Sequence, residues 1–288
     1  MTVVVSAAVH DGIVFAADSA SSLVEIGPSG QIVISNVYSH GNKVFALRKG
    51  LPICGMTAGM GAIGTAPIHS LAKDLRVRFT AEGSDWRFDP GSYRIEDIAN
   101  RARTFFYDER YCRLPEALPA PHSFEFWIGG YSSGSEHPEV WKIAIINGTC
   151  DEPTCLKRGG ETGLDWGGQP DPIQRLVIGF DATLADALVA AGIDPADLPA
   201  LLGMVRARSE VPLCHPAMPI QDAIFLADYL VDTAKKFYRF LPGADTVGGA
   251  TDIATVTRHE RFEWIRRKHY YPAALNPLET DHENGQST

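Results

Sequence analysis

The run Thr2-Val3-Val4-Val5-Ser6-Ala7-Ala8-Val9 joins β-branched residues to small apolar ones. Residues of these kinds favour β-strands. A second apolar run occupies residues 12–17, and Asp11-Gly12 between the two runs is a hairpin signal. We therefore expect the chain to open with a β-hairpin made of residues 2–9 and 12–17.

Thr2 is also the first candidate for chemistry. Once Met1 is removed, Thr2 carries a hydroxyl and a free α-amine on one residue. A free α-amine titrates near pH ~8, well below a lysine side chain. It can therefore accept a proton at neutral pH and activate its own hydroxyl, which is the N-terminal-threonine form of nucleophilic catalysis. Because threonine also simply favours strands, its position alone does not separate a nucleophile from a strand residue.

Beyond the hairpin, strand-like and helix-like patterns follow one another in blocks. Further strands are predicted at residues 31–37, 43–48, 52–58, 124–131, 139–146, 175–179, 252–257 and 261–266. Helices are predicted at residues 66–79, 94–111, 182–192, 195–208 and 219–240. Loops are predicted at residues 80–92, 114–122 and 148–172. This order predicts an α+β fold in which helix layers cover a double sheet, a four-layer α-β-β-α sandwich.

The length and composition are those of one soluble globular domain. The chain has 288 residues, of which 45% are hydrophobic and 21% charged. We assign residues 1–276 to a single domain and residues 277–288 to a polar, disordered tail. The net charge of −9 argues against a nucleic-acid-binding protein, which is usually basic. No apolar stretch reaches the ~18 residues of a membrane span, and no signal-peptide pattern is present, so a cytoplasmic location is expected.

The cysteines favour reduced thiols. There are five of them, Cys54, Cys112, Cys150, Cys155 and Cys214. An odd number with scattered spacing is typical of a reducing compartment. Cys150 and Cys155 flank a turn and are close enough in sequence to pair or to bind a metal, but neither has a second cysteine pair or a histidine cluster nearby. We expect neither a metal nor an organic cofactor.

Three segments resemble proteasome β subunits and their bacterial relatives, which are N-terminal-nucleophile hydrolases. Asp11-Gly12-Ile13-Val14-Phe15-Ala16-Ala17-Asp18-Ser19 is similar to the family's returning strand, and the separation from Thr2 to Asp18 matches the family spacing. Asn42-Lys43-Val44-Phe45-Ala46-Leu47 resembles the strand that carries the family lysine, although a longer excursion over residues 19–41 precedes it. Thr57-Ala58-Gly59-Met60-Gly61 resembles the turn that supplies the oxyanion-binding amide.

The resemblance implies a role for each of four residues. Thr2 would be the nucleophile, and its α-amine would shuttle the proton. Lys43 would lower the pKa of the Thr2 hydroxyl by placing a positive charge beside it, and Asp18 would pair with Lys43. The Gly59 N–H would stabilise the tetrahedral oxyanion. Read singly, Asp18 fits a strand-ending turn, Lys43 a solvated edge-strand lysine and Gly59 a helix-entry turn.

Other parts of the chain follow the family less closely. Residues 126–131 and 245–249 are similar to the family's central strand and its late Gly-Gly turn, whereas residues 80–122 and 149–172 look like expansions. The family has a serine in a turn that we place at Gly179-Phe180-Asp181, where Phe180 replaces it. A second family serine corresponds to Val247, and its companion aspartate falls at Ala244 or, shifted by one, at Asp245. Ser19 and Asp245 are the residues available to compensate.

The resemblance implies a threonine-type protease that cleaves peptide or amide bonds and assembles into a homo-oligomer. The expected partners are therefore a peptide or small-amide substrate and further copies of the chain, with no nucleic acid and no membrane. The alternative is a catalytically silent proteasome-like subunit that acts as an assembly or binding scaffold. A third reading is a hydrolase of small amides that does not act on peptides.

Overall fold

The opening hairpin is present as expected. The computed structural model describes residues 2–26 and 32–268. In it, β1 (Val3–Val9) and β2 (Gly12–Ala17) pair antiparallel, with Val4 opposite Ala17 and Val9 opposite Gly12. This register places the residue before β1, Thr2, at the same end of the hairpin as Asp18.

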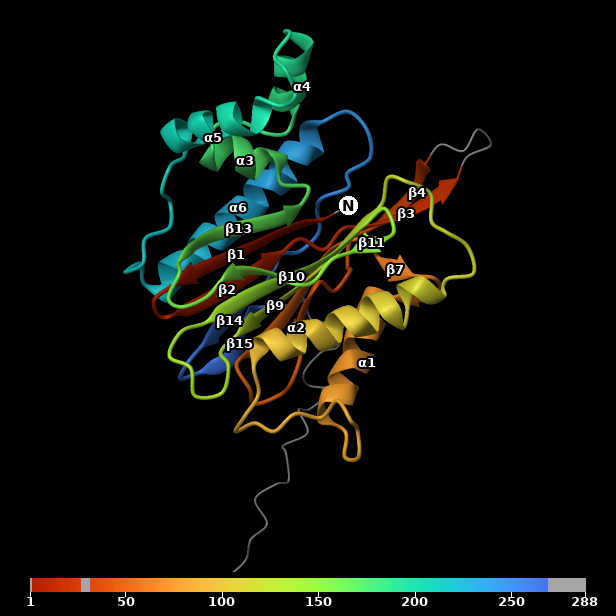
Figure 1. The fold of residues 1–288 in the computed structure, drawn as a ribbon, viewed down its shortest axis with the longest axis vertical. Helices are drawn as coiled ribbons and strands as arrows, with labels where there is room; N and C mark the ends of the chain where they lie inside the picture. The colour runs from red at the N-terminus through yellow and green to blue at the C-terminus, as the bar shows by residue number, and fades with distance from the viewer. Residues whose placement is uncertain (1, 27–31, 269–288) are drawn as a thin grey trace, which may run out of the picture.

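Two antiparallel sheets are stacked in the centre of the molecule (Figure 1). The first sheet has the order β13 (Gly163–Gly168), β1, β2, β14 (Asp252–Thr257) and β15 (Arg261–Arg266). The second has the order β11 (Thr149–Cys150), β10 (Glu139–Ile146), β9 (Ser123–Gly130), β6 (Ile53–Gly59) and β5 (Val44–Ala46), and β12 (Thr154–Lys157) also pairs with β10. A separate hairpin, β3 (Ser21–Ile26) and β4 (Ile32–Tyr38), and a short pair, β7 (Ala62–Ile63) and β8 (Ala66–Pro67), complete the strands.

The burial of β1 explains why its sequence is apolar throughout. Successive side chains of a strand point to opposite faces of the sheet. Val3 and Val5 pack in a cluster with helix residues, whereas Val4 packs between the sheets with Phe15 and Trp127. Since both faces of β1 are covered, the strand carries no alternating polar residues.

Helices cover the outer face of each sheet. The helices α1 (Ile68–Thr80) and α2 (Ile95–Arg103) lie on the second sheet, and a short π-helical turn, Thr104–Asp108, and a 3-10 turn, Tyr111–Arg113, extend α2. The helices α3 (Asp171–Val177) and α6 (Ile220–Phe240) lie on the first sheet. The four layers are therefore α, β, β and α, which confirms the expected fold class.

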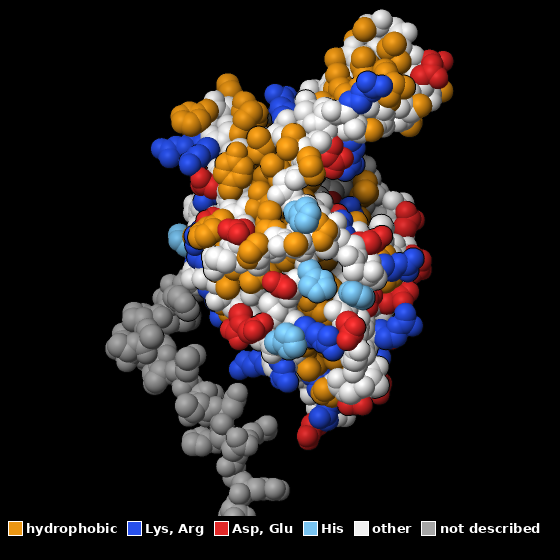
Figure 2. Space-filling model, turned by 90° about the vertical axis from the view of Figure 1, so that its left-hand side faces the viewer, with side chains coloured by type: hydrophobic (Ala, Val, Ile, Leu, Met, Phe, Trp, Pro, Cys, Tyr) orange, Lys and Arg blue, Asp and Glu red, His pale blue; other side chains and the backbone are white. Residues whose placement is uncertain are grey.

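Two further helices project from this sandwich. The helices α4 (Thr183–Ala190) and α5 (Leu198–Ser209) contain no buried residue. They lie beyond α3 at the end of the molecule drawn uppermost (Figures 1 and 2). Among the described residues, no helix is both long and apolar enough to span a membrane.

Most predicted elements are confirmed within a few residues at each end, but two predictions are wrong. Residues 175–179, predicted as a strand, lie mostly in α3, where Ile173 and Val177 are buried one helical turn apart. A short apolar run fits either a strand or a buried helix turn, so periodicity alone does not separate them. The loop predicted at 148–172 contains β11, β12 and β13. Glycine is uncommon in strands, so the glycines of β13 favoured a loop in the prediction. Its hydrogen-bonded pairing with β1 makes this segment a strand. The predicted tail lies outside the described residues.

Candidate functional site

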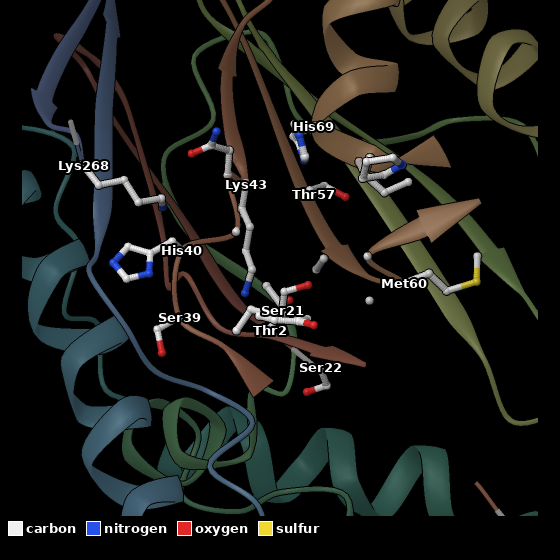
Figure 3. A pocket seen from close by; sticks show the side chains of 18 of the residues that line it. Thr2, Ser21, Ser22, Ser39, His40, Lys43, Thr57, Met60, His69 and Lys268 are labelled. Carbon is white, nitrogen blue, oxygen red and sulfur yellow. The ribbon is translucent and has the colours of Figure 1, made fainter. Parts of the chain in front are cut away.

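The four residues singled out by the sequence converge at one end of the two sheets. Thr2 precedes β1, Asp18 follows β2, Lys43 precedes β5 and Gly59 ends β6. Thr2, Lys43 and Gly59 line one cavity of about 720 Å³, and Asp18 lies behind it with its side chain fully buried. Figure 3 shows the Lys43 side chain pointing toward Thr2 inside this cavity.

Asp18 is the centre of a dense hydrogen-bond network. Its Oδ1 accepts from Lys43 Nζ at 2.6 Å and from the backbone amide of Val3 at 3.0 Å. Its Oδ2 accepts from the amides of Ala20 at 3.1 Å and Gly248 at 2.9 Å. Four donors thus satisfy a carboxylate that has no access to water, as a buried charge requires. The arrangement ties Lys43 to the peptide unit that follows Thr2.

The pKa of the Lys43 ammonium is lowered from its ordinary value. Burial is the main cause, because it disfavours the charged form, and the positive charge of Lys268 acts in the same direction. The negative charge and hydrogen bond of Asp18 oppose these effects. A lysine in this environment can place a positive charge beside the Thr2 hydroxyl, and its lowered pKa makes it release its proton more readily than a surface lysine does.

Gly59 occupies a position that only glycine fits. Its φ is +87°, in the left-handed region, and a Cβ there would lie 2.2 Å from the carbonyl oxygen of Ser123. The next residue, Met60, donates its amide to the same oxygen at 2.9 Å. The chain therefore turns sharply at the end of β6 and leaves backbone, not a side chain, at the wall of the cavity beside Thr2.

The backbone of Thr2 also contacts a segment within the predicted loop 148–172. Gln169 follows β13 and donates its amide to the Thr2 carbonyl oxygen at 2.7 Å. Gly168 approaches so closely that a Cβ would lie 2.0 Å from the same oxygen. The side chain of Gln169 accepts a hydrogen bond from Thr246 Oγ1 at 3.2 Å, and Thr246 is buried. Gln169 and Thr246 are therefore the supporting residues that the sequence did not reveal.

The turn that contacts the Thr2 carbonyl oxygen is Gly168-Gln169, which follows β13, and not the predicted turn Gly179-Phe180-Asp181. Phe180 packs on the helix cluster over the first sheet, and Asp181 pairs with Arg175. The other expected departure, Val247, is fully buried in the same cluster.

The late Gly-Gly turn does reach the site, but Asp245 does not join it through its side chain. Asp245 is exposed on the surface. Gly248 contributes instead: its amide donates to Asp18, and its carbonyl oxygen accepts from the amides of Ser19 and Ala20, each at 2.9 Å. The turn therefore supports Asp18 and the end of β2 through backbone groups.

A second buried lysine lies beside this network. Lys268, which follows β15, bonds through its Nζ to Asp252 and to the hydroxyl of Ser19. Its backbone amide also donates to Asp252 at 3.1 Å, and Ser19 donates to the carbonyl oxygen of Ala250. The hydrogen bonds of the Ser19 side chain therefore link the end of β2 to Lys268, the last described residue. The sequence carried no signal for this contact, because 249 positions separate Ser19 from Lys268.

The cysteines and other titratable groups form no second site in the described part of the chain. All five cysteines are free thiols, so Cys150 and Cys155 do not pair. Burial raises the pKa of the Cys150 thiol to about 11, which makes it a poor nucleophile and a poor metal ligand. Among residues 2–26 and 32–268, no three metal-ligating side chains gather in a way that would hold an ion.

Comparison with known proteins supports the fold. No protein-family model matches this chain, and no curated protein sequence matches it. Among solved structures, it is similar to a Gly-1 mutant of Anbu from Hyphomicrobium sp. strain MC1, with a TM-score of 0.52 and 17% sequence identity over 93% of this chain and 86% of that chain. Anbu is a bacterial proteasome-like protein related to the N-terminal-nucleophile hydrolases. At this identity the similarity shows the fold alone, so the chemistry is argued from the residues.

Proposed function

We propose that this chain is a threonine-type N-terminal-nucleophile hydrolase that cleaves peptide or amide bonds after Met1 is removed. One observation carries the proposal. A single oxygen of Asp18 accepts from Lys43 and from the amide next to Thr2, so a buried lysine is held beside that threonine in an open cavity. A structural ion pair would not require an adjacent hydroxyl, a cavity and a glycine turn at the same place.

The first half of the reaction forms an ester on Thr2. The Thr2 hydroxyl loses its proton to the α-amine, and Lys43 stabilises the developing negative charge on the oxygen. The oxygen attacks the substrate carbonyl carbon, and the carbonyl electron pair moves to the substrate oxygen. The Gly59 amide is the donor proposed for this oxyanion, an effect commonly worth about 3–4 kcal/mol. The C–N bond then breaks, and the amine product leaves with the proton that the α-amine held.

The second half regenerates the enzyme. Water adds to the ester carbon, the Thr2 oxygen leaves, and the proton given up by water returns to it. The acid product then departs. Gln169 and Thr246 position the Thr2 backbone throughout, because Gln169 binds the Thr2 carbonyl oxygen and Thr246 binds the Gln169 side chain.

Labelling of Thr2 tests the proposal directly. We expect intact-mass measurement of the purified protein to show the loss of Met1, and an electrophilic threonine-directed probe to add once per chain. Thr2→Ala is expected to abolish the adduct. Ser21→Ala is the matched control, since Ser21 lines the same cavity and lies outside the Asp18 network. Complete retention of Met1 would contradict the mechanism as stated, and a processed chain that neither labels nor hydrolyses peptides would favour the scaffold alternative.

We also propose that the chain forms a homo-oligomer through its projecting helices. Helix α4 is apolar in sequence yet has no buried residue, and Val189 on α4 and Met204 on α5 are exposed by 42% and 59%. Figure 2 shows apolar side chains gathered at this projecting end. Unpartnered apolar surface of this kind is typical of an interface. Light scattering on the wild type and on Val189→Glu/Met204→Glu tests the proposal, with a smaller mass expected for the variant.

A further inference from the structure

The cavity at Thr2 has a charge opposite to that of the whole chain. The sequence contains 35 acidic and 26 basic residues. None of the described residues that line the cavity is an aspartate or glutamate, whereas the lining includes four lysine and arginine side chains, Lys43, Lys73, Arg267 and Lys268. A concave site lined by one sign of charge concentrates ligands of the opposite sign.

Two of the four cations form ion pairs with buried carboxylates. Lys43 pairs with Asp18 and Lys268 pairs with Asp252, and all four of these side chains are almost completely buried. These two lysines therefore belong to internal networks and contribute little net charge to the cavity.

The other two cations are not neutralised in this way. Lys73 and Arg267 are exposed, and no carboxylate of residues 2–26 or 32–268 forms an ion pair with either of them. The Arg267 Cζ lies 4.9 Å from the ring centroid of Trp264, a cation–π contact that supplies no carboxylate partner. The net positive charge of the cavity wall therefore comes mainly from Lys73 and Arg267.

These two cations stand on separate walls. Lys73 lies on α1 one turn after His69, and Arg267 precedes Lys268 at the end of the first sheet. Figure 3 places His69 and Lys268 on either side of Lys43. Burial and the nearby charge of Lys73 lower the pKa of His69, which favours its neutral imidazole, and this ring adds a hydrogen-bonding group to the wall that carries Lys73.

The polar groups between these walls suit an oxygen-rich ligand. Thr2, Ser21, Ser22 and Ser39 line the cavity with hydroxyl groups. The nearby Glu125 does not line it: its side chain accepts from the indole N–H of Trp127 at 3.0 Å. A carboxylate entering the cavity therefore meets cations and hydroxyl donors and no like charge from a described lining residue.

We propose that the cavity selects peptides that carry a carboxylate close to the scissile bond, and that Lys73 and Arg267 determine this preference. The inference rests on the hydrolase function proposed for Thr2 and names its substrate class. The carboxylate has two sources, an aspartate or glutamate side chain and the free end of a peptide. The acidic side chain is the source that we assign, because two cationic walls beside an open cavity accept an internal segment as well as an end.

Binding to an inactive chain tests the preference without relying on catalysis. Full-length Thr2→Ala protein would be titrated with four fluorescein-labelled hexapeptides, containing a central Glu or a central Gln, each with an amidated or a free C-terminus. We expect the amidated Glu peptide to bind at least about fivefold more tightly than the amidated Gln peptide at low salt. The difference is expected to shrink as salt rises from 0.05 to 0.5 M, roughly, because the exposed charges become screened.

Variants of Lys73 and Arg267 test whether these two residues cause the preference for the Glu peptide. In the Thr2→Ala background, Lys73→Gln and Arg267→Gln are each expected to reduce the Glu-to-Gln affinity ratio by about two- to threefold, and Lys73→Glu/Arg267→Glu to invert it. Lys49→Gln is the control, because Lys49 is an exposed lysine in the turn between β5 and β6 and does not line the cavity. Equal affinity for the Glu and Gln peptides, or no measurable binding of the Glu peptide, overturns the inference. A preference that follows only the free C-terminus overturns the assignment to an acidic side chain.

Turnover by the wild type separates this inference from the function on which it rests. If Thr2→Ala prefers the Glu peptide but the wild type hydrolyses none of the four peptides, the charge preference stands and the hydrolase proposal fails. If the wild type hydrolyses the amidated Gln peptide as fast as the Glu peptide, the hydrolase proposal stands and the substrate class is wrong.

Discussion

Lys43 and Asp18 form a buried ion pair, with Nζ and Oδ1 2.6 Å apart, and the same Asp18 oxygen accepts the backbone amide that follows Thr2. This shared acceptor fixes the lysine relative to the start of the first strand. It also links the two sheets, because Asp18 follows a strand of the first sheet and Lys43 precedes a strand of the second. The pair therefore bears on both the stability of the sandwich and the chemistry that we propose for Thr2.

Removing one partner of this pair is expected to harm the fold more than removing both. Asp18→Asn leaves a buried lysine without a counter-charge, and such changes lower the free energy of unfolding by about 3–5 kcal/mol. The double variant Asp18→Asn/Lys43→Met is expected to be less destabilised than Asp18→Asn alone, and therefore less than the sum of the two single variants. Urea denaturation of the single and double variants measures the coupling. Simple additivity would show that the pair acts only as two independent side chains.

Lys43→Met separates the catalytic role that we propose for Lys43 from its structural role. The methionine keeps the length of the side chain and removes its charge, so hydrolysis and probe labelling are expected to fall by about 100-fold or more. Lys49→Met, at an exposed position, is the control for loss of a lysine. Unchanged labelling of a folded Lys43→Met protein would contradict the proposed role.

Gly59→Ala is expected to disrupt the turn beside Thr2. The new Cβ would lie 2.2 Å from the Ser123 carbonyl oxygen at a φ of +87°, so we expect a loss of stability of more than about 2 kcal/mol together with loss of labelling. Gly83→Ala is a matched control, because Gly83 has a φ of +76° and a methyl group added there would meet nothing within 4 Å. The control is expected to lose only about 1 kcal/mol. Equal losses in thermal unfolding would show that backbone strain, not the close contact, dominates at Gly59.

The Gln169–Thr246 contact is expected to tune the reactivity of Thr2. Thr246→Val keeps the shape of the buried side chain and removes the hydroxyl that donates to Gln169 at 3.2 Å. We expect a stability loss of about 1 kcal/mol and a slower rate of probe labelling. A cycle with Gln169→Ala measures the coupling. If the two variants slow labelling independently, the hydrogen bond between them has no part in positioning Thr2.

Stability is expected to fall in acid partly through Asp181. The pKa of this carboxyl is lowered, first by the hydrogen bond from the Thr183 hydroxyl and then by Arg175. Because the pKa is lower in the folded state than in the unfolded one, this contribution is fully present above the ordinary aspartate pKa and is lost as the pH falls through the folded value. Asp181→Asn is therefore expected to lower the urea midpoint at pH 7 and to have less effect near pH 3. An equal effect at both pH values would exclude this ionisation as the cause.

Much of the site follows from local sequence. Thr2 and Asp18 meet because one short hairpin returns the chain beside its start; the sequence signals that hairpin at Asp11-Gly12, one residue after the observed turn at His10-Asp11. Lys43 and Gly59 lie near each other for a similar reason, since β5 and β6 are adjacent in sequence and paired in the sheet. Such contacts join strands that are close in sequence, so local sequence patterns are enough to predict them.

The apolar run of the first strand, the hairpin and the three candidate residues around Thr2 could be predicted from local sequence. Tertiary structure alone decided that β13 pairs with β1, that Gln169 and Thr246 support Thr2, and that Lys268 reaches Ser19. The difference lies in the separation along the chain over which each interaction acts. Strand and turn preferences act between near neighbours, whereas β13 carries three glycines and becomes a strand only because the edge of β1 supplies its hydrogen bonds. The positive charge of the cavity also depends on tertiary structure, because Lys73 and Arg267 line the same cavity only when the two sheets are stacked.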